Sequence, residues 1–379
     1  MQVALFAGEA SGDLHGALLA REILARSPGA RLWGTGGAKM RDAGVEIVRG
    51  IDELAVLGFV EVIARLPFFM RLFGELKGLI AQRRPDAVVL IDYPGLNLRL
   101  AKAAHEMTIP VAYYVSPQVW AWGEKRVEAI KRCVDRMIVI LPFEEAYYAA
   151  RGVSADFVGH PLVGVATARV SREEARREFV TDPSAKLVGL LPGSRPQELR
   201  AHLPLFLKAI ERARAQGVGV EAVLARAPTL PQPLVDELLA GCANPPRVTA
   251  ETYSVLAAAD LVLVASGTAT LEAALFETPM IVVYKTSAIS YAIGKRLVRV
   301  PHIALANLVA GERVVPELIQ DAATQESIAG EMVALLRDDS RRAVMRETLA
   351  GVRAKLGEPG AAARAAEIVA SLASSRARV

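Results

Sequence analysis

Carboxylate side chains follow an apolar segment at the start of the chain. The loop GEASGD, residues 8–13, comes directly after the apolar run 3–6 and before residues 14–25, which predict a helix. Where α/β proteins bind phosphate, they usually do so at a glycine-bearing loop between a strand and a helix, but Glu9 and Asp13 would repel a pyrophosphate. Carboxylates are instead strong acceptors for neutral hydroxyl groups. We therefore expect this loop to bind a hydroxylated substrate, with a helix N-cap as the alternative role for Asp13.

A third carboxylate, Asp92, lies in the segment LIDYPGLN, residues 90–97. It comes directly after the apolar run 87–91, at the carboxyl end of a predicted strand, where ligands of α/β proteins bind. A carboxylate there can act as general base on an attacking hydroxyl group. The alternative is a turn-forming residue. His15, in the predicted first helix, is a second candidate for the base or else a polar surface residue, and His160 is expected to be structural.

Two tryptophans, Trp120 and Trp122, lie just past another predicted strand, in YVSPQVWAWGEKR, residues 114–126. Indole rings in this position suit the apolar face of a sugar or an acyl chain. We group them with the carboxylates of the first half as candidate acceptor-side residues. A plug in the hydrophobic core is the alternative.

Two glycine-bearing loops in the second half have the composition of phosphate sites. In LLPGSRPQEL, residues 190–199, Gly193 lets the backbone approach a ligand, Ser194 can donate a hydrogen bond, and Arg195 can pair with phosphate. The helix predicted to start there would present its positive end to an anion. An ordinary turn with a surface arginine is the alternative.

The loop ASGTATLEAAL, residues 265–275, repeats this arrangement later in the chain. Ser266, Gly267 and Thr268 place small donors and free amides at a helix start, and Glu272 can accept from sugar hydroxyls. A capped helix is the alternative. Neither loop carries an acidic residue before its helix starts, so together they predict a diphosphate site. No Asp-x-Asp pair ends a predicted strand, so we expect a site that needs no metal and no cofactor.

The elements that must position these residues are short apolar runs separated by helical stretches. Most runs lack alternation, as expected for parallel strands buried on both faces, and their alternation with helices is typical of doubly wound α/β sheets. The 379 residues suffice for two domains with separate cores. We place an N-terminal domain at 1–165, a C-terminal domain at 166–355, and a final helix at 356–379, for which packing on the first domain is one option. The predicted strands are 3–6, 87–91, 111–115, 137–140, 157–158, 187–191, 222–224, 261–265 and 280–284.

Residues 65–84, RLPFFMRLFGELKGLIAQRR, predict a helix with an apolar arc wider than the ~100° that burial on one side requires. Basic residues lie at the margins and ends of this arc. The pattern is typical of a helix that dips into a membrane interface, with Phe68, Phe69, Leu72 and Phe73 as candidate contacts. A helix packed on two sides, or buried in a homodimer, is the alternative.

Composition narrows the class of protein. The net charge of +4 and the pI of about 9.1 are mild for this length, and aromatic residues make up only 6%, so we expect no nucleic-acid partner. Attraction to anionic lipids or phosphorylated substrates fits better. Cys133 and Cys242 have no metal-like spacing and indicate a reduced, cytoplasmic protein. We expect no signal peptide, and the sequence has no apolar run of the ~18 residues that span a membrane.

Six segments of the chain resemble the lipid-A-disaccharide synthase family and occur in the same order. They are GEASGD, ELAVLGFVEV, YVSPQVWAW, LLPGSR, ASGTATLE and NLVAGERVVPELIQ. The resemblance implies a GT-B glycosyltransferase with two Rossmann-like domains facing a cleft. It implies condensation of UDP-2,3-diacylglucosamine with 2,3-diacylglucosamine 1-phosphate to a β-1,6-linked disaccharide 1-phosphate and UDP. It also implies a metal-independent enzyme, peripheral at the inner face of the cytoplasmic membrane.

The resemblance extends to individual positions. Asp92 matches the family's proposed base, and Glu9 and Ser11 match its acceptor-side loop. Matches on the UDP side are Arg195, Glu272 and Asn307. One departure bears on acceptor affinity: after the base the family usually has Asp-x-Pro-Asp-Phe-Asn, whereas this chain has Gly95 and Leu96 in place of the second aspartate and the phenylalanine.

Three alternatives remain open from the sequence. A GT-B enzyme acting on a lipid-linked peptidoglycan precursor would share the nucleotide half but should lack GEASGD and VSPQVWAW. A UDP-sugar epimerase would not need the wide apolar helix. A non-catalytic lipid-binding protein of this fold should not retain the residues assigned to catalysis and UDP binding.

Overall fold

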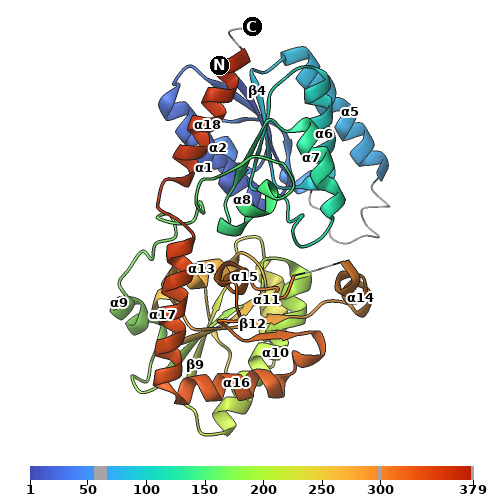
Figure 1. Cartoon of the computed structure of the whole chain (residues 1–379). Coiled ribbons are helices and arrows are strands. Elements are labelled where there is room, and N and C mark those ends of the chain that lie inside the picture. The colour runs from blue at the N-terminus through green and yellow to red at the C-terminus, as the bar shows by residue number, and fades with distance from the viewer. Residues whose placement is uncertain (55–65, 298–299, 377–379) are drawn as a thin grey trace. The chain divides into compact units, whose positions relative to one another are not determined.

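The computed structural model describes residues 1–54, 66–297 and 300–376 (Figure 1). The chain divides into two compact units. Unit 1 comprises Met1–Val163 and Gly357–Val379, and unit 2 comprises Gly164–Leu356. The last helix, α18 (Ala361–Arg376), therefore belongs to the same unit as the N-terminus. The segment ELAVLGFVEV lies outside the described residues from position 55 onward.

Within the described residues, unit 1 contains a seven-stranded parallel sheet in the order β3-β2-β1-β4-β5-β6-β7. The strands are β1 (Gln2–Ala7), β2 (Arg31–Gly36), β3 (Glu46–Gly50), β4 (Ala87–Ile91), β5 (Val111–Tyr114), β6 (Arg136–Val139) and β7 (Ala155–Phe157). The sequence did not predict β2 and β3, because they mix charged residues and glycines with apolar ones. Gly34 in β2 is required by close packing, since a Cβ there would lie 1.8 Å from the Leu5 carbonyl oxygen.

Helices cover both faces of this sheet. Helices α1 (Ala10–Arg26) and α18 pack together on one face, and α5, α6 and α7 lie on the other (Figure 1). The bounds of the others are α2 (Ala38–Asp42), α3 (Ile51–Leu54), α5 (Leu66–Arg83), α6 (Pro94–Glu106), α7 (Val127–Cys133) and α8 (Pro142–Ala149). The strands between these layers are buried, as their continuous apolar runs require.

Unit 2 repeats the design with a six-stranded parallel sheet in the order β10-β9-β8-β11-β12-β13, counted over the described residues. Its strands are β8 (Lys186–Leu191), β9 (Val220–Ala225), β10 (Arg247–Thr249), β11 (Leu261–Ala265), β12 (Met280–Tyr284) and β13 (Glu317–Ile319). Its helices are α9 (Arg172–Phe179), α10 (Pro196–Ala215), α11 (Gln232–Leu239), α12 (Thr252–Ala258), α13 (Ala269–Leu275), α14 (Ala288–Leu297), α15 (Leu305–Ala310), α16 (Gln325–Arg337) and α17 (Asp339–Lys355).

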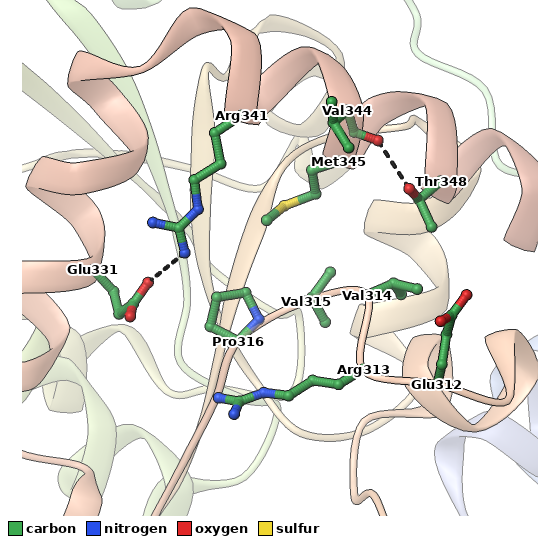
Figure 2. Close-up of a pocket in the computed structure, with 10 residues that line it drawn as sticks. All are labelled: Glu312, Arg313, Val314, Val315, Pro316, Glu331, Arg341, Val344, Met345 and Thr348. Carbon is green, nitrogen blue, oxygen red and sulfur yellow. Dashed lines mark hydrogen bonds and ion pairs between the residues drawn. The ribbon is translucent and has the colours of Figure 1, made fainter.

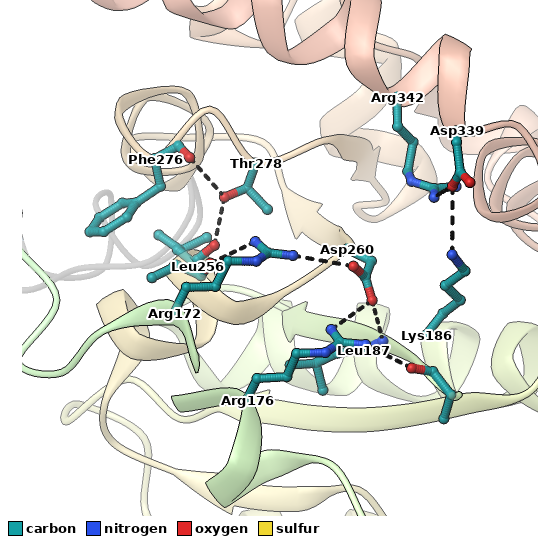
Figure 3. A network of polar contacts seen from close by, with 12 residues as sticks. Arg172, Arg176, Lys186, Leu187, Leu256, Asp260, Phe276, Thr278, Asp339 and Arg342 are labelled. Atoms are coloured by element: carbon teal, nitrogen blue, oxygen red, sulfur yellow. Dashed lines mark hydrogen bonds and ion pairs between the residues drawn. The ribbon is translucent and has the colours of Figure 1, made fainter. Parts of the chain in front are cut away.

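A network of polar contacts lies at the side of this sheet where the strands begin (Figure 3). The Asp260 carboxylate, just before β11, accepts from Arg176 Nη1 at 2.9 Å, from Arg172 Nη2 at 3.3 Å and from the Leu187 amide at 2.9 Å. Both arginines lie on α9, so one carboxylate fixes this helix to two strand starts. The opposite edge, where the strands end, carries the loops considered next.

Candidate functional site

The backbone at the carboxyl end of β4 is strained. Asp92 and Tyr93 both have left-handed conformations, with φ values of 47° and 49°. Their surroundings hold them there: the Asp92 carbonyl oxygen accepts from Tyr113 Oη at 2.6 Å and from Asn97 Nδ2 at 2.7 Å. Left-handed conformations are unfavourable for non-glycine residues and cluster at functional sites. The strain therefore singles out Asp92 among the residues that the sequence proposes.

The Asp92 carboxyl group has an ionisation suited to proton transfer. Burial, together with a smaller effect of the negative charge of Glu9, raises its pKa to about 7, although the Tyr93 backbone amide acts in the opposite direction. The residue is nevertheless partly exposed. When the pKa of a group is near the working pH, a large fraction of the group is deprotonated, and the deprotonated form still binds a proton well enough to act as a general base.

The GEASGD loop packs directly against this strained turn. A Cβ at Gly8 would lie 2.3 Å from the Tyr93 ring, so only glycine fits there. Tyr93 in turn donates its hydroxyl to the Leu54 carbonyl oxygen at 2.9 Å. Glu9 is exposed at the start of α1, and Ser11 is half-buried in the first turn of that helix. The structure thus brings Glu9 and the loop beside Asp92.

Asp13 has a structural role that corrects both predictions made for it. Its buried carboxylate accepts from the backbone amides of Gly37 at 2.6 Å, Lys39 at 3.2 Å and Met40 at 3.0 Å. These amides lie at the start of α2, which Asp13 caps from a neighbouring helix. It is therefore neither the N-cap of its own helix nor a free acceptor-side group.

His15 is also placed differently from the prediction. It is buried at 5% exposure and packs edge-to-face against His160, with ring centroids 6.2 Å apart. Burial, together with a smaller effect of the positive charge of Lys39, lowers the pKa of His15 to about 4. Burial lowers the pKa of His160 to about 3. A buried imidazole of such low basicity is a poor base, and His15 is not a surface residue. His160 is structural, as predicted.

The two tryptophans separate into one anchored and one exposed side chain. Trp120 donates its indole N–H to Glu144 Oε1 at 3.0 Å and packs edge-on against Phe143. Trp122 is 37% exposed and lies under the Arg126 guanidinium at 4.4 Å. Glu144, on α8, was not predicted. It is buried, and its other oxygen accepts from the amides of Ile140 and Leu141. The anchored Trp120 fits the core-plug alternative better than a sugar platform.

In unit 2, the loop after β8 is already bound to an anionic side chain. Glu198 Oε2 accepts from the Ser194 amide at 2.9 Å and from the Arg195 amide at 3.3 Å, and Arg195 Nη1 donates to Glu198 Oε1 at 3.2 Å. Gly193 has a φ of 115°, and a Cβ there would meet Glu198 at 2.3 Å. The groups predicted to hold phosphate thus converge on a carboxylate. A glutamate at the third helical position is a capping-box signal that could have been found in the sequence.

The loop after β11 leaves the same edge of the sheet, because β11 and β8 pair in parallel with Val264 opposite Leu191. Ser266 donates its hydroxyl to the Ile303 carbonyl oxygen at 2.9 Å. Gly267 has a φ of 151°, and Thr268 is exposed before the first turn of α13. Glu272, in that turn, accepts from the Tyr253 hydroxyl at 3.2 Å. The structure therefore brings the two predicted loops to one edge.

Asn307 is fully engaged within the protein. It is buried, donates to the Val315 carbonyl oxygen and to Glu317 Oε1, and accepts from the amides of Val314 and Val315. It therefore fixes the segment between α15 and β13, which corrects its assignment as a direct ligand of UDP.

This segment lines a pocket of about 450 Å³ beside α16 and α17 (Figure 2). None of the predicted site residues lines it, and its charged side chains include Arg341 paired with Glu331. The pocket therefore does not bear on the candidate site.

Helix α5 has one packed face and a small exposed region. Leu72 is 3% exposed in the hydrophobic core, which corrects its prediction as a membrane contact. Phe68, Phe69 and Phe73 are half-buried against the same core. The exposed apolar side chains are Leu66 at 47% and Met70 at 53%, both near the start of the helix. Most of the predicted apolar arc therefore packs against the core of unit 1.

The described residues contain neither a metal-binding cluster nor a membrane-spanning helix. No group of three histidine, cysteine, aspartate or glutamate side chains is arranged to hold a metal ion in the described parts of the chain. Among the helices in those parts, none is both long and apolar enough to cross a membrane.

The sequence matches the family model for lipid-A-disaccharide synthetase over residues 3–371. It is 47% identical over 373 residues to the lipid-A-disaccharide synthase of Syntrophus aciditrophicus (strain SB), covering 98% of this chain and 97% of the relative. It is 44% identical over 369 residues to the enzyme of the same name from Geobacter sulfurreducens, covering 97% and 96%.

Solved structures of two glycosyltransferases and of one UDP complex have the same fold. The glycotransferase of kitacinnamycin gives a TM-score of 0.65 at 19% identity, covering 98% of both chains. The calicheamicin glycosyltransferase CalG4 gives 0.60 at 19% identity, again covering 98% of both. A UDP co-structure of MnaA from S. aureus gives 0.65 at 12% identity, covering 96% of this chain and 94% of the other. These likenesses confirm the predicted GT-B fold. Together, the family model and the sequence relatives show that the chain belongs to the lipid-A-disaccharide synthase family of glycosyltransferases.

Proposed function

We propose that this enzyme transfers 2,3-diacylglucosamine from UDP to the 6-hydroxyl of 2,3-diacylglucosamine 1-phosphate. The acceptor hydroxyl attacks the anomeric carbon and loses its proton, the bond from that carbon to the UDP oxygen breaks, and UDP leaves. The new linkage is β, so the α-linked donor reacts with inversion. Membership of the family supports both substrates.

Asp92 is the proposed base, and its strained turn is the observation that carries the proposal. A primary hydroxyl is a poor nucleophile at neutral pH, so it needs a nearby acceptor for its proton. Asp92 has a pKa of about 7 and a side chain that solvent reaches. Glu9, beside it, would accept a hydrogen bond from the acceptor sugar and keep the Asp92 pKa high. Ser11 is assigned to the same acceptor loop.

Unit 2 is assigned the UDP moiety. Arg195, Ser194 and the loop Ser266-Gly267-Thr268 supply donors at one edge of its sheet, with Glu272 for a sugar hydroxyl. Glu198 now holds the amides of Ser194 and Arg195. The diphosphate must therefore replace this carboxylate or share its donors, and no metal ion is assigned a role.

The exposed start of α5 is proposed to contact the inner face of the cytoplasmic membrane. Leu66 and Met70 provide the apolar contact, and the exposed Arg71 and Lys77 favour anionic lipids. We expect Leu66→Glu with Met70→Glu to abolish pelleting with vesicles of anionic phospholipid and to leave the melting temperature unchanged. Val344→Glu, at a valine 62% exposed in unit 2, is the matched control. Loss of a dimer in sedimentation, with vesicle binding intact, would instead assign this face to a homodimer.

The reaction itself is tested by measuring UDP release from the diacylated donor, with and without the acceptor, in the presence of EDTA. The proposal predicts release that depends on the acceptor and persists in EDTA. Release without acceptor, or epimerisation of the donor sugar, would contradict it.

A further inference from the structure

Unit 2 contains a buried histidine, His202, that is not among the predicted site residues. His202 is on α10 and only 1% exposed, on the helix face that also buries Leu199, Leu203 and Phe206. Its ring stacks on Phe206, with centroids 6.1 Å apart and planes 18° apart. The sequence gives no indication of a functional role for His202, because the residue simply lies on the apolar face of a predicted helix.

Both ring nitrogens of His202 bond to backbone groups. Nδ1 lies 2.9 Å from the Pro192 carbonyl oxygen, and the Lys285 amide donates to Nε2 at 3.0 Å. A carbonyl oxygen accepts only and an amide N–H donates only, so the ring must carry its proton on Nδ1 and be neutral. Burial also lowers the pKa of His202, which favours the same neutral form.

These two backbone groups lie on either side of the candidate nucleotide loops. Pro192 follows β8 and precedes Gly193, and Lys285 follows β12. Strand β11, whose loop begins at Ser266, lies between β8 and β12 in the sheet. His202 therefore connects the ends of the two strands that flank β11.

We infer that His202 is a positioning residue for nucleotide binding, which fixes the loop at Gly193–Arg195 by donating a hydrogen bond to the Pro192 carbonyl oxygen. The inference rests on the proposed assignment of UDP to unit 2. The far side of the same loop is fixed by Thr229, whose hydroxyl donates to the Ser194 carbonyl oxygen at 2.6 Å. Gly193 lies between these two points, and Ser194 and Arg195, the donors proposed for the diphosphate, lie at and directly after the second.

Two substitutions of His202 each keep only one of the two hydrogen bonds that its ring makes. The amide of asparagine reaches the position of Nδ1, so His202→Asn keeps a donor for Pro192. The longer His202→Gln places its amide near the position of Nε2 and keeps an acceptor for Lys285. His202→Phe keeps the ring and its stacking on Phe206 but leaves both backbone groups unpaired.

The experiment is a titration of each purified full-length variant with UDP, together with thermal unfolding. We expect His202→Phe and His202→Gln to bind UDP about tenfold more weakly, as expected for a lost hydrogen bond in the binding loop. His202→Asn should bind within about threefold of the wild type. Ile210→Ala, a buried change farther along α10, controls for stability: it should lower the melting temperature without changing UDP affinity.

Wild-type UDP affinity in folded His202→Phe would overturn the inference, since the residue would then be structural only. Wild-type UDP affinity in His202→Gln but not in His202→Asn would also overturn the inference. The hydrogen bond to the Lys285 amide, and not the one to Pro192, would then be the one that matters for UDP binding. Failure of the wild type to bind UDP would contradict the proposed function instead, so the two failures are distinguishable.

Discussion

The two candidate sites differ in how their polar groups are satisfied. In unit 1, Asp92 sits in a left-handed turn with a raised pKa, and Glu9 beside it is exposed. In unit 2, the amides of Ser194 and Arg195 are held by the carboxylate of Glu198. The proposed acceptor site thus carries strain and an unfavourable charge before any ligand binds, whereas the proposed nucleotide site is stabilised by an internal carboxylate.

This difference has a physical reason. A base must keep its affinity for a proton, so it cannot be neutralised by strong internal partners. A phosphate site only has to present donors, and these can be satisfied by a glutamate until the ligand arrives. We therefore expect changes in unit 1 to affect turnover, and changes in unit 2 to affect nucleotide affinity.

Replacement of the base should have the largest effect. Asp92→Asn should slow turnover by ~10²–10⁴-fold, because the acceptor hydroxyl loses its proton acceptor. UDP affinity should not change. A folded-state pKa above the usual value means that this carboxylate destabilises the protein increasingly as the pH rises from about 4 through about 7. At pH 8 the variant should therefore melt at or above the wild-type temperature. Near-normal turnover would refute the assignment and leave Glu9 as the candidate base.

Removal of the arginine in unit 2 should have the next largest effect. Arg195→Ala should weaken UDP binding by about 1.5–3 kcal/mol, the contribution of a charge-assisted hydrogen bond. The melting temperature should change little, because the partly exposed pair with Glu198 contributes little to stability. Isothermal titration with UDP in EDTA measures this. A strict metal requirement, or unchanged affinity, would contradict the proposed nucleotide site.

Removal of the internal anion should act in the opposite direction. Glu198→Gln keeps the shape of the side chain but removes the charge that competes with the diphosphate, so UDP should bind a few-fold more tightly, about 0.5–1 kcal/mol. The cap on α10 weakens, so the melting temperature should fall. Arg200→Gln, which breaks an exposed ion pair on the same helix, is the control. Weaker UDP binding in Glu198→Gln would show that Glu198 itself helps to hold the nucleotide.

Sequence alone could propose Asp92 as a candidate base, because an apolar strand ending in a carboxylate is a local pattern. It could not show the left-handed turn, which is imposed by Tyr113 and Asn97 from other elements. Asp13 was misassigned because the amides that it caps lie more than twenty residues away, at the start of α2. Leu72 was misassigned because a wide apolar arc does not reveal which part of it packs. The six ordered segments were enough to predict the family and the fold.

The smallest predicted effect concerns acid stability in unit 1. The pKa values of His15 and His160 are lowered to about 4 and about 3, below that of a histidine in the unfolded chain. Their contribution to stability is therefore fully present above about pH 6.5 and is lost as the pH falls toward 4. His15→Gln should lose less stability between pH 7 and 4 than the wild type, measured by urea unfolding. The exposed His105→Gln is the control, and equal losses in all three proteins would disprove this account.

We propose that the Asp92 carboxyl group accepts a proton near neutral pH. The most direct test is a ¹³C NMR titration of aspartate carboxyl groups in the full-length protein, with the Asp92 signal assigned by its absence in Asp92→Asn. We predict a titration midpoint near 7. A midpoint near 4, the value of an ordinary aspartate, would contradict the claim.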